Sequence, residues 1–183
     1  MTRLSSFDPE NMSAAQKTVH DKIAAGPRGI VRGPFAALIV NPAIADSIQA
    51  MGAMLRFDGS LSDRQRELAI LVTARHWTAQ YEWHAHSRIA SEAGIPDTVI
   101  AAIGQRRRPS FVNSEESVVY EFANELLEKR EVGDEIYDGA VASLGEAGVV
   151  ELIALIGYYG IISMTLNVAQ VPLPDGEEAP LRP

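Results

Sequence analysis

Apolar residues recur along this chain with the period of α-helices rather than with the alternation of strands. At about 100° per residue, Ile70, Leu71 and Ala74 fall on the same side as Glu67, whereas Ala69 and His76 fall on the opposite side. With capping residues, glycines and prolines, this period predicts helices over residues 13–25, 42–56, 62–78, 78–94, 96–104, 113–129 and 134–144, and a long apolar helix ending near residue 169. We see no strand pattern and no repeat of solenoid length. The sequence therefore predicts an all-α fold of antiparallel helical hairpins.

The least obvious boundary lies near Thr78, where no glycine or proline separates two predicted helices. Ser62 and Gln65 resemble a capping box that starts the first of them. If that helix continued unbroken, Glu67 and Glu82 would lie about 22 Å apart along one axis, at 1.5 Å per residue. We therefore predict a break near Thr78, with Thr78 as the N-cap of the second helix.

Three ionisable residues, Glu67, Glu82 and His86, lie on the apolar faces of these two helices. Glu67 lies in the middle of its apolar stripe, and Glu82 and His86 are i,i+4 neighbours on the inner face of the next helix. A lone buried carboxylate costs several kcal/mol unless it is paired or protonated. Because three such groups in one pocket can compensate one another, we expect their side chains to meet in the interior.

The composition is that of a folded, acidic domain. The 183 residues are 46% hydrophobic, carry a formal charge of −8 and include no cysteine. This length suits a single domain. An acidic chain is poorly suited to phosphate backbones, so nucleic acid is not expected as a partner. Without cysteine, disulfides, thiolate metal sites and thiol peroxidase chemistry are excluded.

Neither export nor membrane insertion is expected from the apolar segments. The first ten residues mix charge with proline and hold no apolar stretch of signal-peptide length, so we expect a cytoplasmic location. Residues 152–169 carry no formal charge and reach the lower length limit for a spanning helix. They nevertheless include Asn167, Ser163 and two glycines, and lack a flanking basic cluster. We therefore expect a helix buried in the protein or in an oligomer, and no membrane partner.

The two motif helices carry a specific spacing. The run from Leu61 to Ile103 reads LSDRQRELAILVTARHWTAQYEWHAHSRIASEAGIPDTVIAAI. It resembles the carboxymuconolactone decarboxylase family, which includes the alkyl-hydroperoxidase D-like (AhpD-like) proteins. In the peroxidase branch, a Glu is followed after eleven residues by Cys, after two by Cys and after three by His. Counted from Glu67, the cysteine positions are Ala79 and Glu82, and the histidine is His86.

The resemblance also implies how the chain is organised, and it extends to a last helix in the segment from Glu151 to Pro174. It implies a single AhpD-like helical domain over residues 1–183. Its parts are a helical N-terminal extension (1–40), the motif helices (61–104) and an irregular tail (172–183). The family suggests a homotrimer, or a hexamer built from trimers.

Without the cysteine pair, the resemblance implies decarboxylase chemistry rather than a disulfide relay. The family reaction removes carbon dioxide from a small carboxylated lactone of aromatic catabolism, whose own conjugation accepts the electrons, so neither a metal nor an organic cofactor is expected. His86 is the candidate acid or oxyanion donor, Glu67 would orient the imidazole, and Glu82 would share that duty or relay a proton. The candidates for binding the small-molecule carboxylate substrate are Arg64, Arg75, His84 and Tyr81.

Other interpretations remain open. Glu67 can pair with Arg64, with Arg75 or with an arginine elsewhere, and His86 can be a core histidine bonded to Glu82. Purely structural roles are also open for the aromatic residues, since Tyr81, Trp83, Tyr158 and Tyr159 can be packing residues. His84 and arginines 106–108 can be solvent-exposed surface residues; for these arginines, attraction of an anion is the alternative. The functional alternatives are an isomerase or hydrolase with the same acid–base groups, a non-catalytic ligand-binding or stress protein, and a divalent metal site.

Overall fold

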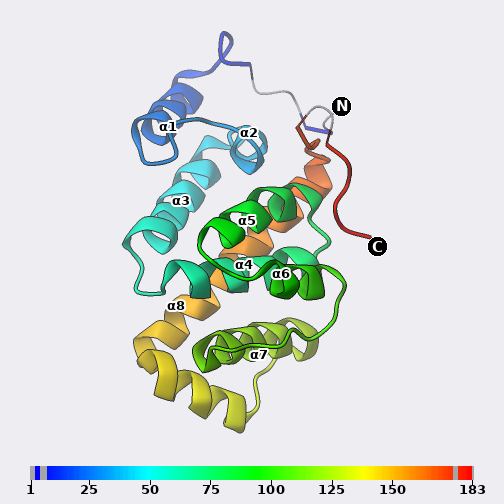
Figure 1. Cartoon of the computed structure of the whole chain (residues 1–183). Helices are drawn as coiled ribbons and strands as arrows, with labels where there is room; N and C mark the ends of the chain where they lie inside the picture. Colours follow the sequence, from blue (N-terminus) through cyan, green and yellow to red (C-terminus); the bar gives the residue numbers. More distant parts are fainter. Residues whose placement is uncertain (1–2, 5–7, 175–176, 183) are drawn as a thin grey trace.

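The computed structural model describes residues 3–4, 8–174 and 177–182, and in these residues it contains helices and no strand. The elements are α1 (Ala14–Ala25), α2 (Pro34–Leu38), α3 (Pro42–Ala53), the π-helix η1 (Met54–Asp58), α4 (Asp63–His76), α5 (Gln80–Glu92), α6 (Asp97–Gly104), α7 (Ser114–Lys129) and α8 (Asp134–Ala169). The predicted all-α fold is confirmed. Figure 1 shows α1–α3 gathered at one end of the molecule and α7 at the other, with α4, α5 and α6 between them.

Helix α4 forms the centre of the core. It packs against α5, α7 and α8, and every residue from Glu67 to Arg75 is buried. The sequence pattern had placed Ala69 on the outer side of this helix, yet Ala69 is fully buried. A helix enclosed on all sides needs no polar face, so its sequence periodicity understates its burial.

The helix starts follow local capping chemistry. Ser13 and Gln16 form a capping box at α1, and Ser62 and Gln65 form the predicted one at α4. Helix α2 was not predicted, although a proline at the first helical position, here Pro34, is compatible with a helix start.

One further boundary differs in detail from the prediction, because the predicted helix over 42–56 ends in the π-helix η1. The two predicted C-terminal helices are both present within α8, which begins after Gly133, and they meet at a kink with non-helical backbone at Gly145. There φ is +70° and ψ is 166°, a backbone conformation that glycine adopts without strain.

The predicted break between α4 and α5 is present, but Thr78 is not its N-cap. Thr78 has φ of +48°, and the N-cap of α5 is Ala79. The amide of Thr78 donates to the carbonyl of Arg75 and the amide of Ala79 donates to that of Ala74, which is the hydrogen-bond pattern of a Schellman motif. A β-branched residue in this conformation costs about 1–2 kcal/mol. The Thr78 hydroxyl offsets part of this cost, since it accepts hydrogen bonds from Arg75 at 2.9 Å and Arg106 at 3.3 Å.

Helix α8 is the one described helix that is long and apolar enough to cross a membrane by length and composition alone. Its most apolar 18-residue window has a mean hydropathy of 1.8, and 56% of that window is buried inside the fold. The core helix of a soluble protein passes the same test. Tyr158, Tyr159 and Ile162 are buried on its inner face, whereas Val150 and Val168 are exposed on its outer face.

The end of the described chain packs back onto the motif helices. Residues 177–182 form no helix or strand, and Leu181 is buried. The Gln80 side chain accepts from the Leu181 amide at 2.9 Å and donates to the Leu181 carbonyl at 2.8 Å. The predicted irregular tail thus has a fixed attachment to α5; residues 175–176 and 183 of that tail lie outside the described residues.

Candidate active site

Glu67, Glu82 and His86 meet in the interior, where α4 and α5 pack side by side. His86 Nδ1 lies 2.5 Å from Glu67 Oε2, and His86 Nε2 lies 3.0 Å from Glu82 Oε1. The side chains are almost fully enclosed: Glu67 is 1% exposed, and Glu82 and His86 are each 4% exposed. The imidazole therefore lies between two carboxylates, one from each helix. Glu67 and Glu82 are thus both partners of His86, since each glutamate contacts one ring nitrogen.

The two carboxylates favour a protonated imidazole. Burial alone would lower the pKa of His86, but the neighbouring Glu82 and Glu67 outweigh burial and raise that pKa from 6.5 to about 9. An imidazolium donates from both ring nitrogens, which matches two acceptors, whereas a neutral imidazole has a single N–H. Near pH 7 the group is thus a hydrogen-bonded Glu–His⁺–Glu triad.

A cavity of about 610 Å³ opens beside the triad, and Glu82 and His86 reach its wall while Glu67 lies behind them. Tyr159 packs edge-on against the His86 ring, with ring centroids 5.2 Å apart, and Tyr158 packs edge-on against Tyr159. Burial raises the pKa of both phenols, so each keeps its proton near neutral pH. The other residues of the wall include Arg28, Arg32, Arg56, Phe57, Tyr81, His84 and Arg88.

The cationic side of this cavity comes from segments outside the motif helices. Arg28 and Arg32 lie in the loop between α1 and α2, and Arg56 lies in η1. The Arg28 guanidinium lies over the Phe35 ring at 4.6 Å and donates to the Tyr158 hydroxyl at 3.3 Å. π-Helical turns are frequently found at functional sites, and here the turn carries an arginine of the wall. The sequence analysis did not single out these arginines.

Gly52 on α3 allows Arg28 and Tyr158 to approach each other. A Cβ atom at position 52 would lie 2.0 Å from the Tyr158 hydroxyl and 2.6 Å from Arg28 Nη2. No side chain fits there without displacing the phenol or the guanidinium. Glycine at this position is therefore required by a close approach at the cavity wall.

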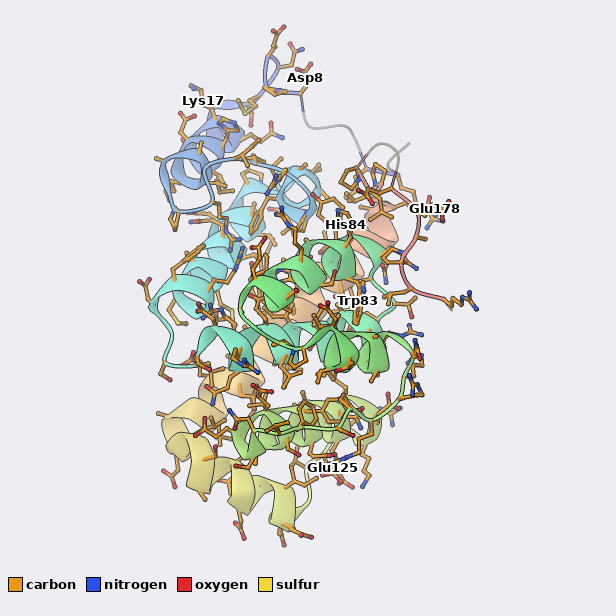
Figure 2. The ribbon with its side chains drawn as sticks, viewed as in Figure 1. Asp8, Lys17, Trp83, His84, Glu125 and Glu178 are labelled. Atoms are coloured by element: carbon orange, nitrogen blue, oxygen red, sulfur yellow. The ribbon has the colours of Figure 1, made fainter. Side chains whose placement is uncertain are left out.

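The four candidates for substrate binding separate into two pairs. Tyr81 and His84 line the cavity, and His84, labelled in Figure 2, lies 3.9 Å from Glu177 of the C-terminal segment. Arg64 lies outside the cavity, paired with Glu116 on α7 at 2.6 Å. Arg75 also lies outside it, where it donates to Thr78 and to the carbonyl of Arg182.

Neither Arg64 nor Arg75 pairs with Glu67. The arginine nearest to that carboxylate is Arg66, whose Nε lies 3.9 Å from Glu67 Oε1. Trp83, labelled in Figure 2, faces α6 and fills the space above Gly104.

The triad is linear rather than convergent. Each carboxylate contacts a different nitrogen of the same ring, so the three donors do not face a common point. In the described residues, no group of three or more histidines and acidic residues has an arrangement that could hold a metal ion. Metal analysis of the purified protein is the direct measurement for the metal alternative.

The comparisons with known proteins concern the family and the fold. Residues 42–125 match the profile of the Carboxymuconolactone decarboxylase family. No curated protein matches the chain.

Two solved folds are similar over almost the whole chain. One is the AhpD core of an uncharacterized peroxidase-related protein from Ralstonia eutropha JMP134, with a TM-score of 0.78 at 15% identity, covering 95% of this chain and 93% of that one. The other is the debrominase Bmp8. Its alanine variant in complex with 2,3,4-tribromopyrrole has a TM-score of 0.74 at 15% identity, covering 98% and 94% of the two chains. Its apo form has a TM-score of 0.73 at 14% identity, covering 98% and 95%.

These identities show the fold alone, whereas the motif region carries the family match. The chain has the AhpD-like fold, and neither cysteine of the peroxidase pattern is present: Ala79 is fully buried and Glu82 belongs to the triad. Residues 42–125 therefore resemble the carboxymuconolactone decarboxylase family in sequence, and the chain has no cysteine.

Proposed function

We propose that the protein is a cofactor-independent lyase that decarboxylates a small carboxylated lactone or a related ring acid. The observation that carries the proposal is the buried Glu67–His86–Glu82 triad, which borders an arginine-lined cavity of about 610 Å³. Proton transfer and anion binding are what this arrangement offers, and they are what such a decarboxylation requires.

The proposed reaction proceeds in two steps. The bond between the ring carbon and the carboxylate breaks, carbon dioxide leaves, and the electron pair moves through the conjugated double bond to the ring carbonyl oxygen. The resulting enolate then takes one proton on carbon. His86 supplies that proton, directly or through Glu82, and regains one from solvent; each turnover consumes one proton. General acid catalysis of this kind contributes about 10²- to 10⁴-fold in rate.

The glutamates differ in their proposed roles. Glu67 lies behind the imidazole, away from the cavity, and holds the positive charge of His86 in place. Glu82 lies at the wall, where a second negative charge would repel the substrate. The proton on His86 and the arginines of the wall reduce this repulsion.

Arg28, Arg32 and Arg56 are the proposed binding groups for the spectator carboxylate, in place of Arg64 and Arg75, which lie elsewhere. The Tyr158 hydroxyl accepts a hydrogen bond from Arg28, so its own hydrogen remains available for the developing enolate oxygen. His84 and Tyr81 also line the cavity, and the Tyr81 ring lies against Gly33, next to Arg32.

The solved neighbours bear on this proposal in two ways. The debrominase Bmp8 was crystallised with a small substituted ring, 2,3,4-tribromopyrrole, which supports a small-ring ligand for this fold. The name of the other neighbour refers to peroxidase. Disulfide-relay peroxidase chemistry requires a thiolate, and none of the 183 residues is cysteine.

We further propose a cytoplasmic homotrimer, or a hexamer of trimers. The outer face of α8 supports self-association, since partly buried or exposed small and apolar residues recur there with heptad spacing: Val150, Ala154, Gly157, Ile161, Met164 and Val168. Light scattering after size-exclusion chromatography gives the mass. Ile161→Glu should lower it, and a monomeric wild type would contradict the proposal.

The test of the activity is carbon dioxide release from carboxymuconolactone and related lactone acids, with His86→Ala and Glu67→Gln alongside the wild type. We expect release by the wild type and a loss of about 10²-fold or more in His86→Ala. If His86→Ala is folded and as active as the wild type, the role of His86 is wrong. If the wild type releases none, the decarboxylase proposal fails; turnover of non-decarboxylated ring acids would then indicate an isomerase or hydrolase.

Peroxide consumption with a dithiol donor is the complementary assay. We expect no turnover above the blank, because the chain has no thiol. Robust turnover would contradict the argument from the missing cysteines. A protein that binds ring acids but turns over none would be a ligand-binding protein.

A further inference from the structure

Two guanidinium groups, from Arg75 and Arg106, converge on one hydroxyl behind the α4–α5 corner. Arg75 Nη1 donates to Thr78 Oγ1 at 2.9 Å, and Arg106 Nη2 donates to the same oxygen at 3.3 Å. Arg75 is only 5% exposed. Its Nη2 donates to the Arg182 carbonyl at 2.8 Å, and its buried Nε has no hydrogen-bond partner.

Neither Arg75 nor Arg106 forms an ion pair with a carboxylate within the part of the chain that the structure describes. The ion pairs found there involve other cations; Arg64 and Arg108, for example, pair with Glu116 and Glu121. Burial, and then the nearby charge of Arg106, lower the pKa of Arg75, which is the direction expected of an uncompensated cation. Buried charges in proteins are normally paired, and among the described residues Arg75 has no partner anion.

Arg75 and Arg106 face a cavity of about 430 Å³ formed by α4, α6 and α7. Arg108, His76, Tyr120 and Asn124 add polar groups to its wall, and Glu128 adds a carboxylate. Arg108 is already paired with Glu121 at 2.5 Å, and His76 lies 3.3 Å from Glu128. The uncompensated positive charge is therefore concentrated at Arg75 and Arg106.

We propose that this cavity binds a small oxyanion, with Arg75 and Arg106 as its main ligands. Guanidinium groups bind the oxygens of phosphate and carboxylate groups in pairs, and the free Nε of Arg75 supplies an unused donor. The site is separate from the triad, because neither arginine lines the cavity beside His86. A site of this kind agrees with the alternative interpretation that arginines 106–108 attract an anion. It also means that the ligand of Arg75 is this oxyanion and not the proposed substrate.

The test is isothermal titration calorimetry of the full chain with inorganic phosphate, and with methyl phosphate to distinguish a free ion from a phosphate monoester. Chloride balances the ionic strength. Arg106→Gln is the main variant, because Arg106 is exposed and its loss leaves the core intact. We expect wild-type binding of at least one probe, and weakening by about tenfold or more in Arg106→Gln, since hydrogen bonds to charged groups are the strong ones. Arg108→Gln should weaken binding less, because Glu121 already engages Arg108.

Two controls carry the same change in charge. Arg107 is adjacent to Arg106 but bonds to the Gln105 side chain and does not line the cavity. Arg88 lines the cavity beside the triad and a wider surface depression of about 1120 Å³, which Arg75 and Arg106 also line. Both Arg107→Gln and Arg88→Gln should bind the probe within about twofold of the wild type, as expected for charges that do not touch the ligand.

Several outcomes would overturn the proposal. They are the absence of binding to wild type, equal weakening in Arg107→Gln, or loss of binding in Arg88→Gln but not in Arg106→Gln. Dissociation of an oligomer by Arg106→Gln, with no phosphate bound by the wild type, would mean that a carboxylate of a second copy meets these arginines instead. None of these outcomes bears on carbon dioxide release, so the two proposals fail separately.

Discussion

Replacing Glu67 with glutamine tests whether the triad holds an imidazolium. The substitution keeps the size of the side chain and an oxygen that can accept from His86 Nδ1, at present 2.5 Å from Glu67 Oε2, but removes the negative charge. Burial, which lowers the pKa of His86, is then opposed by Glu82 alone. We expect the pKa of His86 to fall from about 9 by at least about 1.

The magnitude follows from the present pKa. A rise from 6.5 to about 9 corresponds to about 3 kcal/mol of stabilisation of the folded state by protonated His86, at about 1.4 kcal/mol per pKa unit. Since the folded-state pKa lies above the unfolded one, this contribution is complete below pH 6.5 and is lost as the pH rises through about 9. The wild type should therefore lose stability between about pH 7 and pH 10, and Glu67→Gln should lose less.

The assay combines an NMR titration of the ¹⁵N-labelled imidazole with denaturant unfolding at several pH values. Glu116→Gln is the matched control, because Glu116 is also buried but pairs with Arg64 instead of His86. It should destabilise the protein without moving the His86 titration. A wild-type His86 that titrates near 6.5, or a titration that is unchanged in Glu67→Gln, would refute the Glu–His⁺–Glu description.

Three other substitutions test separate contacts. Gly52→Ala should lower the free energy of unfolding by about 1–3 kcal/mol in denaturant titrations, because its Cβ would displace the Tyr158 hydroxyl. Gly139→Ala, with open space around it, should be neutral or stabilising. Equal effects of the two substitutions would contradict the close-approach argument. Glu151→Gln should reduce the loss of stability on acidification below pH 4.5. Burial raises the pKa of Glu151, but hydrogen bonds from Ser60 and Leu61 outweigh burial and lower that pKa. The ionised Glu151 carboxylate therefore stabilises the folded state above pH 4.5, and this stabilisation is lost as the pH falls. The exposed Glu146→Gln is its control, and an identical acid profile in both would count against this account. Thr78→Val should lower the thermal midpoint by the equivalent of about 1–3 kcal/mol, since Arg75 and Arg106 lose their shared acceptor, while Thr165→Val, which removes an exposed hydroxyl, should not; a neutral Thr78→Val would show that the hydroxyl is dispensable.

The sequence predicted what depends on neighbours along the chain. The capping box at Ser62 and the i,i+4 pair of Glu82 and His86 are local, and both are found in the structure. The break near Thr78 was inferred from the need to bring Glu67 close to Glu82. Its conformation was not, because threonine disfavours positive φ and one of its two hydrogen-bond donors, Arg106, lies 28 residues away.

The arginines of the cavity could not be predicted from neighbours in sequence. Arg28 reaches the site by contacting Tyr158, which is 130 residues away. Arg64 and Arg75 are close to Glu67 in sequence, but α4 is enclosed on all sides, so its residues face different neighbours: Arg64 turns to Glu116 on α7 and Arg75 to the C-terminal segment. The helical period shows which residues share a face, and not which helix covers that face.

Position 82 has a consequence for the history of this protein. In the peroxidase pattern it holds the second thiol, and here it holds the carboxylate that contacts His86 Nε2. One position therefore holds either the second thiol of the peroxidase pattern or the second carboxylate of the triad, and it cannot hold both. Cysteine and glutamate codons differ at every base, so stepwise passage between them goes through some other amino acid. A lineage that crossed in either direction had an ancestor with neither the dithiol nor the triad.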